Sequence, residues 1–113
     1  MNLPPIDIKK LTRKRRTDPL ESKIEREVCE YAKAQGVPHR KFKTPAQRGA
    51  PDRVFLLGSE KVAFIEFKRG GQRPTPNQER EHVKLRSLGY IVEVVDNIEQ
   101  GKKVIDLWVS LYK

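Results

Sequence analysis

The stretch that decides the fold is DRVFLLGSEKVAFIEFK, residues 52–68. Its two halves, 52–57 and 61–68, are rich in β-branched and aromatic residues, as β-strands are. Only Gly58-Ser59-Glu60 separates them. This spacing predicts a β-hairpin.

Two acids, Asp52 and Glu66, lie in or beside this apolar hairpin. Side chains alternate between the two faces of a strand, and one face of 61–68 carries Ala63, Ile65 and Phe67, all apolar. The other face changes from apolar to charged at Glu66 and Lys68. The turn allows two registers, which place Asp52 opposite either Glu66 or Phe67. Two carboxylates and an amine therefore converge at one end of the hairpin.

Carboxylates at such a distance repel each other unless a proton or a cation lies between them. A hard divalent ion, Mg²⁺ or Mn²⁺, fits Asp52 and Glu66, and the backbone carbonyl of Phe67 is a candidate further ligand. Lys68 could then orient or help to deprotonate the attacking water, or offset charge on a phosphate. The alternative is an ordinary surface ion pair at a strand end, because the spacing D-x₁₃-E-x-K is only moderately specific.

Upstream of the hairpin, the pattern predicts a helix over 19–35. Asp18 can cap this helix, Pro19 suits its first position, and Gly36 is a natural stop. Residues 38–43 form a weaker strand candidate.

Downstream, Thr75, Pro76 and Gln78 form a capping box that opens a helix ending at Gly89. A strongly apolar strand follows at 90–95. Asp96 and Glu99 form a second box that predicts a last helix, whose first turns Gly101 interrupts. The order is helix, three strands, helix, strand, helix, which predicts an α/β fold with a mixed sheet flanked by helices.

The charge balance indicates a polyanion as partner. The 113 residues fit one domain and contain 24 Lys and Arg against 15 Asp and Glu, a formal charge of +9. Residues 1–17 carry many of these bases and few apolar anchors, so we expect a flexible basic arm ahead of a domain at 18–113. A membrane span, a signal peptide and an internal disulfide are not expected, which suggests an intracellular, cytoplasmic protein.

The motif residues resemble the virus-type replication-repair (VRR-Nuc) domain of the PD-(D/E)XK nuclease superfamily. They are Gly49-Ala50-Pro51-Asp52-Arg53, then Phe64-Ile65-Glu66-Phe67-Lys68, then Gln78. The resemblance covers about residues 20–97 and implies the restriction-endonuclease-like core, order αβββαβ(α). Stand-alone proteins of this family are small, often phage-encoded, and resemble homodimeric resolvases, so a homodimer is expected.

By this resemblance Asp52 and Glu66 bind metal, Lys68 acts at the attacking water, and Gln78 faces the same cleft. The family also uses a glutamate of the first helix as a metal or water ligand. Glu25 is favoured because Glu25-Arg26-Glu27 resembles the E-R-E of archaeal Holliday-junction resolvases. Glu21, one turn earlier, is the alternative, although it also suits a capping box with Asp18.

Basic residues around this cleft form a candidate nucleic-acid footprint. They are Arg40, Lys41, Lys43, Arg48, Arg53, Arg69 and Arg73, together with Lys14, Arg15 and Arg16 of the arm. No base-reading module is evident, so recognition by backbone and shape is expected.

The sequence therefore predicts a Mg²⁺- or Mn²⁺-dependent DNA endonuclease, selective for branched, flap or junction DNA in repair, replication or recombination. The alternatives are a non-catalytic DNA-binding accessory protein on the same fold and, less favoured, an RNA-binding protein. Several reactive or aromatic residues are interpreted as structural or polar-surface residues rather than as catalytic ones: Cys29, His39, His82, Trp108 and Tyr112.

Overall fold

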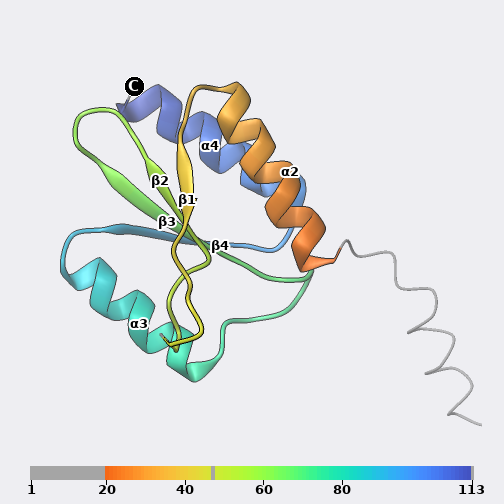
Figure 1. Cartoon of the computed structure of the whole chain (residues 1–113), viewed down its shortest axis with the longest axis vertical. Helices are drawn as coiled ribbons and strands as arrows, with labels where there is room; N and C mark the ends of the chain where they lie inside the picture. Colours follow the sequence, from red (N-terminus) through yellow and green to blue (C-terminus); the bar gives the residue numbers. More distant parts are fainter. Residues whose placement is uncertain (1–19, 47, 113) are drawn as a thin grey trace, which may run out of the picture.

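A computed structural model of the chain describes residues 20–46 and 48–112 (Figure 1). The elements in chain order are α2 (Glu21–Ala34), β1 (His39–Lys41), β2 (Arg53–Leu56), β3 (Val62–Phe67), α3 (Pro76–Ser87), β4 (Ile91–Val95) and α4 (Ile98–Tyr112). The predicted basic arm, residues 1–17, lies outside the described residues. No helix in the described part of the chain has the length and apolar character needed to cross a membrane.

The four strands form one mixed sheet in the order β1-β2-β3-β4. The β1–β2 and β2–β3 pairs are antiparallel, and β3 and β4 are parallel, joined through α3. Helices α2 and α4 cover one face of the sheet and α3 covers the other (Figure 1). The predicted fold class and element order are confirmed.

The side chains of β3 alternate between the two faces of the sheet and contribute to a buried cluster on each face. Ala63, Ile65 and Phe67 belong to the larger buried cluster, and Phe64 belongs to a smaller cluster with Leu85 of α3. Helices α2 and α4 complete the larger cluster with Ile24, Val28, Cys29, Ala32, Ile105 and Trp108. The charged end of β3 therefore lies on the α3 side of the sheet.

Two predicted helix starts are wrong. Helix α2 begins at Glu21 instead of residue 19, and its N-cap is Leu20, with no side-chain hydrogen bond; Asp18 and Pro19 lie outside the described residues. At α4 the Asn97 side chain, not that of Asp96, accepts the Gln100 N–H at 2.7 Å. Asp96 instead accepts the Gly71 N–H at 3.1 Å, which ties the loop before α3 to the end of β4. The capping box of α3 is present as predicted.

Gly101 lies inside α4 and has a packing role there, although glycine is a poor helix former. A Cβ at this position would lie 2.3 Å from Cγ2 of Val28, so the missing side chain lets α4 approach α2 closely. Trp108 is buried against Phe55, and Cys29 is buried with the pKa of its thiol raised to about 11 by burial. These two residues are structural, as the sequence indicated.

Candidate active site

Asp52 and Glu66 face each other where β2 begins and β3 ends. The β2–β3 register is the first of the two predicted registers, and its last pair is Arg53 with Ile65. Asp52 and Glu66 are the next residues beyond that pair, one on each strand. The Asp52 N–H donates to the Ile65 carbonyl at 3.1 Å, and the Phe67 N–H donates to Oδ2 of Asp52 at 2.7 Å. These two bonds fix Asp52 against the end of β3.

The two carboxyl groups are poorly solvated. The side chain of Asp52 is 10% exposed and that of Glu66 only 1%. Burial, and next the nearby Asp52 carboxylate, raises the pKa of Glu66 to about 8. Burial also raises the pKa of Asp52, against the opposing effect of the Phe67 N–H. At neutral pH the pair therefore needs a shared proton or a cation.

The oxygens of this pair suit a hard cation. Oε1 of Glu66 is buried and accepts no hydrogen bond, although an ionised oxygen in that position normally has a partner. Among the described residues, no three His, Cys, Asp or Glu side chains are close enough to hold an ion by themselves. A divalent ion held by Asp52 and Glu66 would thus complete its coordination with backbone carbonyl and water oxygens, which Mg²⁺ tolerates well.

Two lysines bring positive charge to the carboxylates. Nζ of Lys68 lies 3.8 Å from Oε2 of Glu66, and this side chain is 11% exposed. Nζ of Lys43 lies 3.7 Å from Oδ1 of Asp52 and 3.9 Å from Oε2 of Glu66. The predicted grouping of two carboxylates with Lys68 is present, and Lys43 joins it from the loop after β1.

Gln78 links the start of α3 to the carboxylates. Its Oε1 accepts the Thr75 N–H at 2.9 Å within the capping box, while its Nε2 donates to Oε2 of Glu66 at 2.8 Å. One side chain therefore caps the helix and orients Glu66.

His82 is the residue that sequence reasoning missed. It is 2% exposed, and its Nε2 lies 4.0 Å from Oε1 of Glu66, with neither atom hydrogen-bonded. From the sequence, His82 is expected at the polar surface or on a helix face. Its spacing of four residues from Gln78, which puts both side chains on one face of α3, was the signal that could have found it.

The two candidate acids of α2 differ in their partners. Oε2 of Glu25 accepts from Nε of Arg53 at 2.6 Å, so this carboxylate is already paired. Burial first, and then the Asp52 carboxylate, raises the pKa of Glu21, whereas Lys68 and Lys43 lower it. Glu21 therefore lies within electrostatic reach of the carboxylate–lysine cluster.

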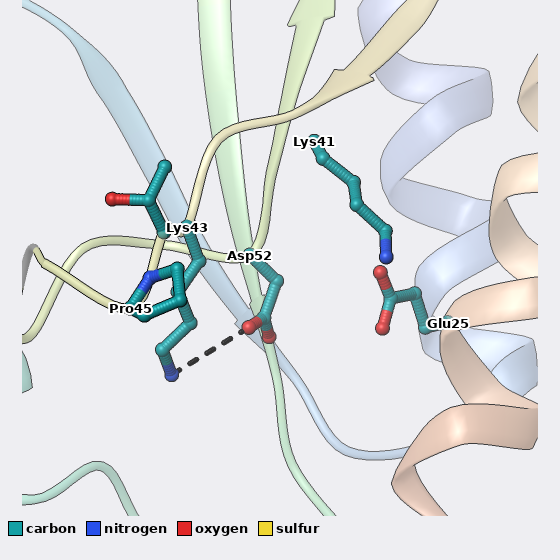
Figure 2. Close-up of a pocket in the computed structure, with 6 residues that line it drawn as sticks. Glu25, Lys41, Lys43, Pro45 and Asp52 are labelled. Carbon is teal, nitrogen blue, oxygen red and sulfur yellow. Dashed lines mark ion pairs between the residues drawn. The ribbon is translucent and has the colours of Figure 1, made fainter.

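A cavity of about 340 Å³ opens beside Asp52. Glu25, Lys41, Lys43, Thr44, Pro45 and Asp52 line it. Figure 2 shows Lys43 reaching Asp52 from the loop after β1, with Glu25 of α2 on the far side. The cavity thus gives a route from solvent to Asp52.

The residues of the predicted basic footprint differ in their exposure. Arg40, Lys41, Lys43, Arg48 and Arg73 are exposed. Arg53 is paired with Glu25 and its side chain is 19% exposed, and Nε of Arg69 is buried without a hydrogen-bond partner. Lys14, Arg15 and Arg16 lie outside the described residues.

A mixed sheet with helices on both faces, carrying an Asp–Glu–Lys cluster at the end of its central hairpin, defines the restriction-endonuclease-like core. A solved structure described as "VRR_NUC domain" matches with a TM-score of 0.69 and 32% identity, over 76% of this chain and 94% of that one. A second, "VRR_NUC domain protein", has a TM-score of 0.66 and 22% identity, over 84% and 92%, and supports the fold alone.

The chain is also 44% identical over 70 residues to "Putative nuclease p44" of Acyrthosiphon pisum secondary endosymbiont phage 1. This alignment spans 62% of the chain and 74% of that relative. No protein-family model matches the chain. At these levels of identity and coverage, the chain belongs to the VRR-Nuc family, as its motifs predicted.

Proposed function

We propose that this protein is a nuclease that hydrolyses DNA phosphodiester bonds with Mg²⁺ or Mn²⁺. The observation that carries the proposal is the buried Asp52–Glu66 pair, with an unpartnered oxygen on Glu66 and with Lys68 alongside. Such a pair is costly in a small domain unless it binds a cation. The phage relative, which its name describes as a nuclease, supports the same activity.

In this proposal each residue has a separate role. Asp52 and Glu66 hold the divalent ion, which when bound supplies a Lewis acid for the phosphate and lowers the pKa of water. Lys68, fixed at the end of β3, holds the attacking water or carries part of the negative charge on the phosphate. Gln78 acts through Glu66 as a positioning residue.

We propose Glu21 as the acid of the first helix, in place of Glu25. Both acids interact electrostatically with Asp52, but Glu25 is also held in an ion pair with Arg53, whereas Glu21 interacts with Glu66, Lys68 and Lys43. Replacement of Glu21 by Gln is then the more damaging change to cleavage. A larger loss from Glu25→Gln would restore the assignment that the sequence favoured.

Substrate and assembly are part of the same proposal. The exposed bases near the cavity suit contacts with the DNA backbone, and hence recognition of branched, flap or junction DNA by shape. This is the substrate class of repair, replication and recombination. Symmetric cutting of a junction needs two sites, so we propose a twofold homodimer. A monomeric mass in light scattering at micromolar concentration contradicts the dimer.

The test is cleavage of matched duplex, nicked, flap and four-way DNA in Mg²⁺, Mn²⁺ or EDTA. Parent protein and Asp52→Asn are compared under each condition. Cutting that requires metal and is lost in Asp52→Asn supports the nuclease, and the preferred DNA identifies the substrate. Binding of DNA without cutting in every metal supports the accessory-protein alternative instead.

A further inference from the structure

Lys43 occupies an unusual position for a surface lysine. Its ammonium lies between the two acids, 3.7 Å from Oδ1 of Asp52 and 3.9 Å from Oε2 of Glu66. These are the same two groups to which the proposed function assigns the divalent ion. In the absence of metal the ammonium therefore offsets part of the negative charge of the pair.

Lys43 and Lys68 differ in their freedom to move. Lys68 extends from the end of β3 and is 11% exposed, whereas Lys43 lies in the loop after β1 and is 41% exposed. Lys43 also lines the solvent-accessible cavity beside Asp52 (Figure 2). Of the two ammonium groups, Lys43 is the one that can leave the carboxylates without disturbing the sheet.

A divalent ion and the Lys43 ammonium exclude each other from this place. An ion held by these carboxylate oxygens would occupy the place beside them that the ammonium now takes, at 3.7 and 3.9 Å. Two cations so close together repel by several kcal/mol in a partly buried site. Binding of the ion must then displace the Lys43 side chain into the cavity. There its ammonium is free to form an ion pair with an anion.

We propose that Lys43 is a resident counter-cation of the Asp52–Glu66 pair, which a divalent ion displaces and which then binds a phosphate of the DNA substrate. The inference rests on the proposed function for its ion and its substrate. It assigns to Lys43 two successive partners, first the carboxylates and then the phosphate.

The first test measures binding of Mn²⁺ to the full chain by titration calorimetry, without DNA. Lys43→Met removes the competing charge, and the Mn²⁺ dissociation constant should fall on the order of ten-fold. Lys41→Met is the matched control, because Lys41 lines the same cavity but makes no ion pair with Asp52 or Glu66; it should change the constant less than two-fold. Lys43→Gln, which keeps a polar tip, is used if Lys43→Met does not fold.

The outcomes separate the inference from the proposed function. Mn²⁺ binding by the parent that Lys43→Met leaves unchanged or weakens overturns the counter-cation role alone. The same is true if Lys41→Met tightens binding equally. Absence of Mn²⁺ binding in the parent and in all variants overturns the metal-dependent function together with this inference.

The second test addresses the phosphate. In a Lys68→Ala background, which prevents cleavage under the proposed function, affinity for duplex DNA is measured by fluorescence anisotropy with Mg²⁺ and with EDTA. Lys43→Met should weaken binding several-fold in Mg²⁺ and less than two-fold in EDTA, where the carboxylates retain Lys43. Equal weakening under both conditions overturns the transfer of Lys43 to phosphate.

Discussion

Replacing Glu66 by Gln should stabilise the metal-free protein at high pH. The pKa of Glu66 is about 8 in the folded chain, against 4.5 for an unperturbed glutamate, so folding favours the protonated form. The contribution of this group to stability is therefore fully present below pH 4.5 and is lost as the pH rises through 8. In Glu66→Gln the new amide would keep the hydrogen bond from Gln78, and its nitrogen could donate to the unpartnered Nε2 of His82.

The size of this effect follows from the same values. One pKa unit corresponds to about 1.4 kcal/mol, so the rise from 4.5 to about 8 gives an upper bound of about 5 kcal/mol. Lost ion pairs with Lys43 and Lys68 offset part of this bound. We expect Glu66→Gln to be more stable by about 1–3 kcal/mol at about pH 9 and unchanged near pH 4.5.

Urea denaturation in EDTA at both pH values measures the difference, and repetition with Mn²⁺ provides a second comparison. Mn²⁺ should stabilise the parent but not Glu66→Gln, because binding to the folded state alone raises stability. Glu93→Gln, a partly buried acid of β4 outside the cluster, is the control. A variant that is less stable than the parent at about pH 9 in EDTA would refute the reasoning about desolvation.

Three further substitutions test the site and the fold. Lys68→Ala should abolish DNA cleavage while changing DNA affinity little in a filter-binding assay; exposed Lys61→Ala is its control, and unchanged turnover contradicts the assigned role. Gln78→Ala should lower the free energy of unfolding in urea by about 2 kcal/mol and reduce cleavage, because both the helix cap and the hydrogen bond to Glu66 are lost. A loss of stability without a loss of cleavage would mean that Gln78 only caps the helix. Gly101→Ala should lower the stability by about 1–2 kcal/mol, measured as a lower Tm, because the new Cβ would clash with Val28. Ser110→Ala is the control. An unchanged Tm in Gly101→Ala contradicts the close packing of α2 on α4.

Local patterns were sufficient to predict the centre of the fold and the core of the site. The hairpin followed from two β-rich runs separated by three residues, and its turn length limited the pairing to two registers, one of which is observed. The capping box at Thr75 and Gln78 was equally local, because all of its atoms lie within four residues. Where the contact is close in sequence, spacing alone predicts it.

Contacts between distant elements were not predictable in this way. The ion pair of Glu25 with Arg53 joins α2 to β2, and nothing in the local spacing of either segment indicated it. The contact of His82 with Glu66 depends on how α3 lies on the sheet. At the start of α4, Asp96 and Asn97 are both suitable cap residues. The Asp96 side chain accepts the Gly71 N–H, and the Asn97 side chain accepts the Gln100 N–H of the helix.

The packing of α3 on β3 explains why the unfavourable features of this chain lie together. Glu66 and His82 are buried, face each other and lack a hydrogen bond between them, and each such group normally destabilises a small domain. Around them, Gln78 directs its hydrogen bonds to Thr75 and Glu66, and two lysines supply compensating charge. Local conflict with the rules of stable packing is expected at a functional site, and here it includes Glu66, which the motif identifies, together with His82, which it does not.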